Sequence, residues 1–315
     1  MNQPYTLLDA AYATARWGWY SAAFLLLGAG SYAPFLFRAR TGVDATHPDL
    51  ASGLARRAAR IGFGAALALI LLALIRLYLQ SRTLLDPDEP LSGEFLRAVL
   101  GSAWGRGWIR QGIMVLLATL AFAAARGGSR FGWMVAAGAG GGLGLTIGMT
   151  GHAATEKAGR LGFILDAAHV WGGGFWLGGL AVLLFAGIAA CRTLPAAERP
   201  QLLRALVADF SRRALVFGPL TIGLGVWLAI RYLGWTWPLH LFESRYGVVL
   251  SIKLAALILV GALGAYNWRV VQPSLRRPEA EGRLRNSARL ELFFGLLLLA
   301  ATAVLVALPL PGDDM

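Results

Sequence analysis

The chain has 315 residues, of which 57% are hydrophobic and only 15% are charged, and its mean hydropathy is +0.59. Soluble domains carry about 25% charged residues, so this composition excludes a water-soluble globular protein. The formal net charge of +12 does not indicate nucleic-acid binding, because the basic residues lie in short segments between apolar runs and form no patch interleaved with aromatic residues.

Eight long apolar runs follow one another along the chain. They predict transmembrane helices at roughly 16–37, 56–80, 108–126, 131–150, 161–190, 210–233, 247–270 and 288–309. A run of about 20 apolar residues can cross the hydrocarbon core of a lipid bilayer as a helix. The runs do not alternate in polarity, as the strands of a membrane barrel would. We therefore expect one all-α transmembrane domain, residues 1–315, built as a polytopic bundle of about eight helices.

The distribution of Lys and Arg predicts the orientation of this bundle. Of the 29 basic residues, 18 lie in the first, third, fifth and seventh connections, and 8 lie in the other connections and the tails. The richer set should face the cytoplasm, which places both termini on the periplasmic side. Residues 1–16 lack the pattern of a cleaved signal peptide, so we expect the first helix to remain. Arg76 and Arg110 lie near helix ends and are expected to extend toward the membrane surface.

Glycine is concentrated in the fourth and fifth predicted helices. The residues are Gly138, Gly140, Gly141, Gly142, Gly144 and Gly148 in the fourth, and Gly172, Gly173, Gly174, Gly178 and Gly179 in the fifth. Small residues let helix backbones approach closely in lipid. We expect these two helices to pack directly against each other at the centre of the bundle.

The chain contains four histidines. His47 falls in a predicted solvated loop, and His240 falls in an interfacial aromatic segment. His152 follows the fourth helix at its outer end, and His169 lies about two turns into the fifth helix from the same side. Two antiparallel helices with a short connection would bring His152 and His169 to a similar depth, and ionisable groups inside membrane helices are usually functional.

Two further residues extend this pair into a candidate metal site. Met149 and Asp166 each lie three residues before one of the histidines, a spacing that places both members of a pair on one helix face. Thioether and imidazole groups suit copper. Asp166 could be a ligand or could orient the ring of His169. The predicted metal site is therefore His152, His169, Asp166 and Met149; the alternatives are a hydrogen-bonded pair that joins two helices, and ordinary packing for Met149.

Three other residues bear on transport. Lys253, about two turns below the outer surface, could pair with Asp166, neutralise an anion or repel a cation in a gate. Glu291, near the cytoplasmic end of the last helix, is expected to pair with a neighbouring arginine, with a transport role as the alternative. Cys191, the only cysteine, is expected to pack at the inner end of the fifth helix, with an exit-side copper contact as the alternative.

The sequence contains no enzyme motif, neither the P-loop GxxxxGK[ST], nor HExxH, nor CxxC, so we expect no catalytic activity. Copper capture remains the leading hypothesis. Histidine must be neutral to bind a metal ion, so capture should weaken as the pH falls through about 6.5. Two alternatives stay open: a b-type haem protein that uses the same histidine pair, and a copper-delivery or assembly factor that does not transport.

Several segments resemble the CopD-type copper resistance proteins. They are Gly151-His152-Ala153, the run from Asp166 through His169, Trp171 and Trp176 to Leu180, Phe210-Ser211, Tyr246-Gly247 with Lys253, then Asn267, Glu291, Pro309 and Pro311. The resemblance implies a multi-pass protein of the cell inner membrane with eight helices that moves copper from the periplasm toward the cytoplasm. It also implies a separate periplasmic copper-binding partner of the CopC type, a metal region at His152, Asp166 and His169, and supporting roles for Trp171 and Trp176.

Overall fold

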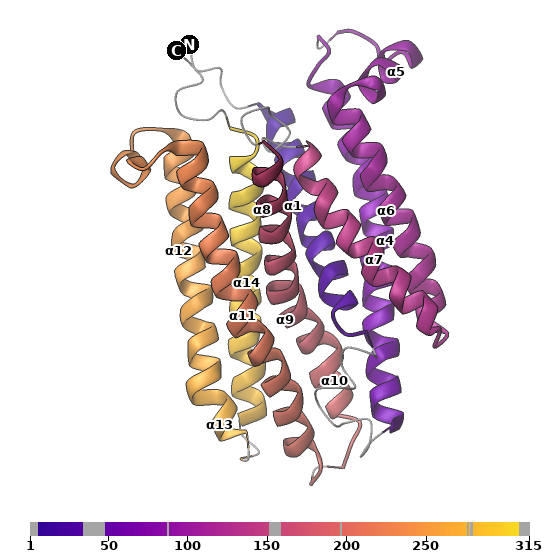
Figure 1. The fold of residues 1–315 in the computed structure, drawn as a ribbon, viewed down its shortest axis with the longest axis vertical. Helices are drawn as coiled ribbons and strands as arrows, with labels where there is room; N and C mark the ends of the chain where they lie inside the picture. Colours follow the sequence, from indigo (N-terminus) through magenta and orange to yellow (C-terminus); the bar gives the residue numbers. More distant parts are fainter. Residues whose placement is uncertain are drawn as a thin grey trace.

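The structure is a computed structural model that describes residues 6–33, 48–86, 88–150, 159–195, 197–275, 277 and 280–308. All regular elements in these residues are helical, which confirms the predicted all-α class. Figure 1 shows long helices that run side by side along the longest axis of the molecule. They are α1 (Leu7–Gly30), α4 (Pro48–Arg82), α6 (Ala103–Arg126), α7 (Arg130–Ile147), α8 (Gly159–Gly173), α11 (Arg199–Leu233), α12 (Arg245–Tyr266) and α14 (Ala280–Leu305).

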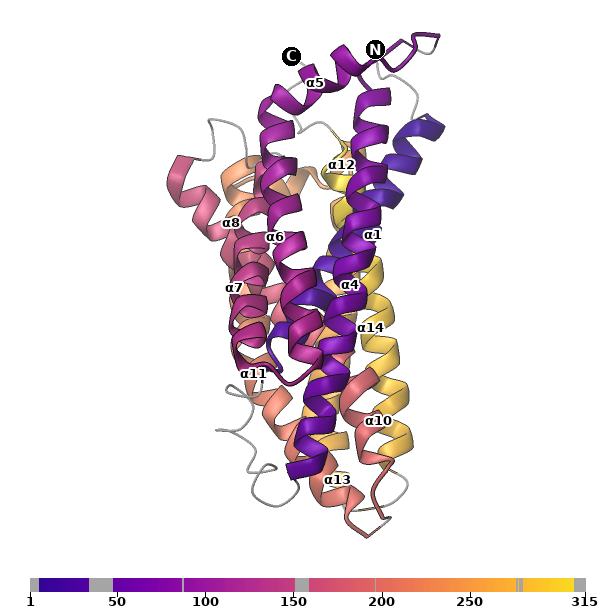
Figure 2. The ribbon, with the colours of Figure 1, turned by 90° about the vertical axis from the view of Figure 1, so that its right-hand side faces the viewer.

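Short elements extend or connect these helices. The fifth helix continues from α8 through η4 (Gly174–Gly178), α9 (Gly179–Val182), η5 (Leu183–Gly187) and α10 (Ile188–Cys191), with η4 and η5 wound as π-helix. The others are α5 (Gly93–Gly101), the 3-10 turns η1 (Gly148–Thr150) and η6 (Trp237–His240), the π-helical η7 (Asn267–Val271) and α13 (Gln272–Ser274). Figure 2 shows α5 lying across one end of the bundle, and α13 lies at the opposite end. We call these ends the α5 end and the α13 end.

In the described part of the chain, seven helices are long and apolar enough to cross a membrane: Pro48–Arg82, Ala103–Arg126, Arg130–Thr150, Leu161–Cys191, Arg199–Leu233, Arg245–Ser274 and Ala280–Leu305. The protein is therefore a multi-pass membrane protein. The first predicted helix is present as the 24-residue α1, which packs against α4, η4 and α14, although its first half carries Asp9 and Arg16 and is less apolar. The first turn of α1 and the last turn of α14 both lie at the α5 end (Figure 1).

The fifth helix forms the centre of the bundle, as its glycines predicted. Of its most apolar window 83% is buried, against 17 to 50% for the other six membrane-length helices. The closest backbone contact, however, is with α1 and not with α7. A Cβ added to Gly28 would lie 2.1 Å from the carbonyl carbon of Gly178, and one added to Gly178 would lie 1.8 Å from the Phe24 carbonyl oxygen. Glycine content favoured the fourth helix as the partner, because α1 has only three glycines, Gly18, Gly28 and Gly30.

The fourth and fifth helices do meet, but through a tryptophan. Trp171 of α8 packs against Gly144 of α7, where an added Cβ would overlap its indole ring. Its indole N–H donates to the carbonyl oxygen of Gly141 at 3.0 Å. The glycines of α7 thus provide space for an aromatic side chain and leave the backbone-to-backbone contact to α1.

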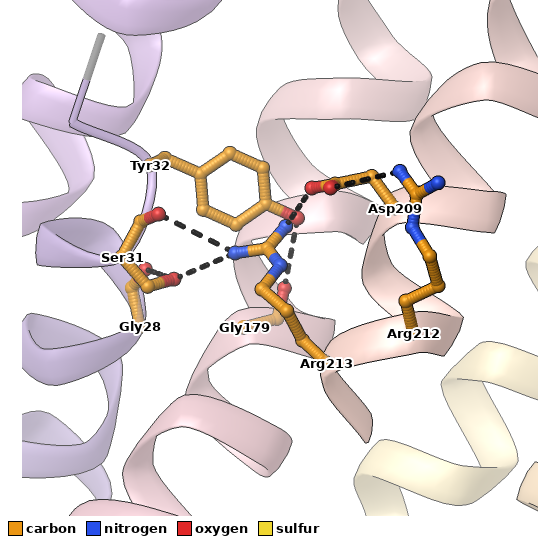
Figure 3. A network of polar contacts seen from close by, with 7 residues as sticks. All are labelled: Gly28, Ser31, Tyr32, Gly179, Asp209, Arg212 and Arg213. Atoms are coloured by element: carbon orange, nitrogen blue, oxygen red, sulfur yellow. Dashed lines mark hydrogen bonds and ion pairs between the residues drawn. The ribbon is translucent and has the colours of Figure 1, made fainter. Parts of the chain in front are cut away.

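A buried polar network joins the end of α1 to the fifth helix and α11 (Figure 3). The Arg213 guanidinium lies over the ring of Tyr32 and forms an ion pair of 2.8 Å with Asp209. It also donates to the backbone oxygen and the hydroxyl of Ser31, at 3.3 and 3.2 Å. The Tyr32 hydroxyl donates to the carbonyl oxygen of Gly179 at 3.3 Å. The paired charges and fixed partners satisfy polar groups that would be costly in an apolar interior.

Candidate functional site

A cavity of about 290 Å³ lies among α1, α8, α11, α12 and α14 and extends from η6 at the α5 end down to Trp176. Most of its wall is apolar. The residues that bring hydroxyl, carboxylate, imidazole or ammonium groups to it are Tyr20, Asp166, His169, Thr221, Tyr232, Tyr246, Lys253 and Thr302. A largely apolar cavity with a few converging polar groups is the usual form of a binding site.

His169 is held in a defined orientation within this cavity. Its Nδ1 lies 2.9 Å from the backbone oxygen of Thr221 on α11. A carbonyl oxygen only accepts hydrogen bonds, so Nδ1 carries the proton and Nε2 keeps its lone pair. Metal-binding histidines commonly donate their second N–H to a carbonyl oxygen in this way. The ring is therefore in the tautomer that can bind a metal ion through Nε2.

Glycine on α11 makes room for the ring. A Cβ added to Gly225 would lie 3.0 Å from His169 Cε1 and 3.5 Å from Nδ1. Gly172 plays the same part on α8, since an added Cβ would overlap the hydroxyl of Thr221. Small residues on both helices thus bring the imidazole to the Thr221 carbonyl. Sequence analysis did not find Thr221 or Gly225, which lie more than 50 residues from His169 in the chain.

Asp166 lines the same cavity, one turn before His169 on α8. Lys253 of α12 also lines the cavity and attracts the Asp166 carboxylate across it. No ion pair within 4.0 Å joins these two described side chains. The cavity therefore contains an imidazole nitrogen and a carboxylate on one helix, with an ammonium group on a neighbouring one.

The other predicted site residues have different positions. His152 and His47 lie outside the described residues, and the side chain of His240 in η6 is not described either. Met149 lies in η1 but is not part of the cavity wall. It packs against Gly107 of α6, and Arg110 donates to its sulfur at 3.5 Å. Among the described residues no group of three His, Cys, Asp or Glu side chains could hold a metal ion.

Arg76 is buried and does not extend to the surface, so that prediction is wrong. Only 2% of it is exposed, and its guanidinium donates to Gln111 and Thr150 at 3.2 Å each and lies over the ring of Trp19. Gln111 also donates to the Thr150 hydroxyl, at 3.1 Å. These contacts fix the end of η1 two residues before His152. The signal in the sequence was Gln111, an uncharged polar residue beside Arg110 in a mostly apolar run.

Two other expectations concern the half of the bundle nearer the α13 end. Glu291 is 2% exposed and accepts a hydrogen bond from Asn267 at 2.9 Å; no arginine pairs with it in the described part of the chain, so the expected ion pair is wrong. Cys191 is a buried free thiol in the hydrophobic core at the end of α10. Trp176 forms part of the cavity floor and also lies beside the Glu291 carboxyl group.

Comparison with known families is consistent with these features. Residues 7–163 match the family described as Copper resistance protein D-like, N-terminal domain, and residues 204–305 match Copper resistance protein D. The chain belongs to the CopD-type family. Asp166 and His169 lie between the two matched ranges of this CopD-type chain, whereas Thr221, Lys253 and Glu291 lie within the second.

Two curated proteins are similar to this CopD-type chain. Copper resistance protein D of Pseudomonas syringae pv. tomato is 30% identical over 165 residues, which are 51% of each chain. Copper transport protein CutJ of Bacillus subtilis (strain 168) is 26% identical over 272 residues, which are 82% of this chain and 47% of the relative. The chain thus spans about half the length of the curated relatives it matches. No solved structure matches it.

Proposed function

We propose that this CopD-type chain captures copper ions in the cavity at the α5 end and moves them through the membrane. The observation that carries the proposal is the fixed tautomer of His169, whose Nδ1 is bonded to Thr221 and whose Nε2 is left for a metal ion beside Asp166. Copper is the substrate here and not a resident cofactor. The two similar proteins, a copper resistance protein and a copper transport protein, support the same metal.

The chemistry of the donor set agrees with copper. Imidazole nitrogen is a good ligand for either oxidation state, and a carboxylate oxygen suits Cu(II). We propose His152, which lies outside the described residues, as the source of a second imidazole; it follows by two residues Thr150, whose hydroxyl is held by Arg76 and Gln111. Met149, which contacts α6, becomes a ligand only if η1 rearranges. The positive charge of Lys253 opposes cation entry and attracts the Asp166 carboxylate across the cavity.

We further propose that the chain resides in the cell inner membrane with the α5 end toward the periplasm. The excess of Lys and Arg in the connections at the α13 end supports this orientation. Copper then enters from the periplasm, delivered by a copper-binding protein of the CopC type, and moves toward the cytoplasm. The lipid bilayer is the other partner, and no nucleic acid is involved.

The test is copper stoichiometry in purified protein. A His152→Ala, His169→Ala double variant should lose bound copper, measured by elemental analysis after loading, while its helical circular dichroism is retained. His47→Ala, in the predicted solvated loop, is the matched control and should bind as the wild type does. Retained stoichiometric copper in the double variant would contradict the site.

Two alternatives are separated by simple measurements. A b-type haem protein would show a Soret band; the cavity of about 290 Å³ is at the lower limit of the ~300–1,000 Å³ usual for small-molecule sites, and His169 is its one described histidine. A copper-delivery or assembly factor would bind copper without moving it. Copper uptake into sealed vesicles distinguishes transport from delivery.

A further inference from the structure

A second polar cluster lies below the cavity and plays no part in copper capture. It consists of Glu291 and Ser287 on α14 and Asn267, the first residue of the π-helical η7. Glu291 lies seven residues, about two helical turns, before Leu298, which lines the cavity. A carboxyl group at this depth in a membrane helix is costly and is commonly part of an ion or proton pathway.

The neighbours of Glu291 are hydrogen-bond donors and not metal ligands. The Asn267 amide nitrogen donates to Oε2 of Glu291 at 2.9 Å, and Trp176 lies beside the same carboxyl group. Gly264 adds no side chain, so the second carboxylate oxygen has space beside it. A cation would need lone pairs at this place, whereas N–H groups occupy it. The cluster therefore suits a proton and not copper.

No charged group neutralises Glu291 among the residues that the structure describes. The titratable groups on the elements packed against α14 have other positions and partners. On α12 and η7 they are Arg245, Tyr246, Lys253, Tyr266 and Arg269, and on α1 they are Asp9, Tyr12, Arg16 and Tyr20. Tyr20, Tyr246 and Lys253 line the cavity, and Arg269 lies over Trp268. Proton binding is then the direct way to remove the buried charge.

The hydrogen bonds of the cluster can accommodate both protonation states. With Glu291 ionised, the Ser287 hydroxyl donates to the Asn267 amide oxygen, and the amide nitrogen donates to Glu291. With Glu291 protonated, its O–H donates to the amide oxygen once the amide has turned over. The amide nitrogen then donates to Ser287, whose hydroxyl turns to the Arg283 backbone oxygen, already 2.9 Å away. One proton is gained, and every donor keeps an acceptor.

The cluster also lies between two openings. Trp176 connects it to the cavity at the α5 end. On the other side, Trp268 and Gln272 follow Asn267 and line a pocket of about 980 Å³ at the α13 end. The Gln272 side-chain oxygen is buried without a hydrogen-bond partner. The turn η7 is π-helical, a form frequent at functional sites. A rotation of the Asn267 amide at the start of η7 can therefore shift the residues that line this pocket.

We infer that Glu291 is a proton-binding residue that couples copper movement to proton movement, and that Asn267 and Ser287 relay its protonation state to η7. The coupling of copper movement to proton movement rests on the proposed transport function. Proton binding itself does not require copper.

The first experiment measures proton binding without copper. Infrared difference spectra of the purified protein, recorded across a pH titration, should contain a carboxylic-acid C=O band that is absent from Glu291→Gln. Glu281→Gln is the matched control on the same helix, because Glu281 is half-buried and lies 3.9 Å from Arg192 at the α13 end. Ser287→Ala should keep the band and move its titration midpoint. An unchanged spectrum in Glu291→Gln overturns the inference.

The second experiment measures coupling. Proteoliposomes should take up copper at a rate that responds to an imposed pH gradient, and Glu291→Gln should lose that response while still binding copper at the cavity. A Glu291→Gln protein that responds to the gradient as the wild type does overturns the coupling. If the wild type binds or takes up no copper, the proposed function and the coupling both fail, whereas the infrared band still decides whether Glu291 binds a proton.

Discussion

At the scale of single residues, the candidate site depends on a histidine ring that two helices hold in place. The Thr221 carbonyl fixes the tautomer of His169, and the absence of a side chain at Gly225 lets the ring reach it. The i, i+3 spacing of Asp166 and His169 was visible in the sequence, and both residues line one cavity. Thr221 and Gly225 were not visible, because their relation to His169 depends on how α8 packs against α11.

This dependence gives a prediction for Gly225. A methyl group in Gly225→Ala would lie 3.0 Å from His169 Cε1, and the ring would have to move from the Thr221 carbonyl. Copper affinity should fall by ~10- to 100-fold, as for the loss of other groups that orient metal ligands. Gly223→Ala is the matched control on α11, since nothing lies within 4 Å of an added Cβ there. Isothermal titration with copper measures both, and equal affinities would show that the Thr221 contact is dispensable.

Buried polar residues were the least predictable part of the molecule. Arg76 and Glu291 both lie near helix ends in the sequence, which favoured contact with solvent or with neighbouring charges. In the structure both are 2% exposed and bonded to amides, Arg76 to Gln111 and Glu291 to Asn267. A helix that ends near the membrane surface can still turn a charged face inward, and a single sequence does not reveal which face a neighbour covers.

At the scale of helices, hydropathy predicted the elements well, and of the two glycine-rich helices expected at the centre, the fifth is the more buried. Some helices are longer than the apolar runs that predicted them. The helix α11 begins at Arg199 and not near 210, because its first turns lie before the apolar run. The choice of partner was harder. Glycine-rich runs in the fourth and fifth helices suggested a direct contact, but α1 makes the closer approach, where Gly178 lies against the backbone of Phe24 and Gly28.

The contact between α1 and the fifth helix should be sensitive to one methyl group. Gly28→Ala would place a Cβ 2.1 Å from the backbone of Gly178, so the helices must separate. We expect a loss of about 1–3 kcal/mol or more, the usual cost of overpacking. Gly138→Ala in α7, with open space around it, should have little effect. Thermal unfolding in detergent compares the two, and equal melting temperatures would argue against a tight crossing.

At the scale of the whole molecule, the distribution of basic residues predicts which end faces the cytoplasm. The sole cysteine is buried, so a Cys191→Ser background permits single labelling sites. Glu89→Cys, exposed at the α5 end, should react with an impermeant maleimide in intact cells, and Glu198→Cys, exposed before α11 at the α13 end, should react only after the cells are opened. The reverse pattern would invert the proposed direction of copper entry.

The two π-helical turns in the fifth helix have a consequence for how this protein could be altered. Each such turn accommodates one residue more than regular winding allows, and one residue corresponds to about 100° of rotation around a helix axis. Deleting one residue from η4 would therefore restore regular winding and leave Asp166 and His169 before it, and Leu180 and Cys191 after it, facing their present neighbours, whereas deleting one residue from the regular α9 would rotate everything after it. The two π-helical turns are thus the positions in the fifth helix where a residue can be removed without changing which residues lie between the cavity and the opposite end.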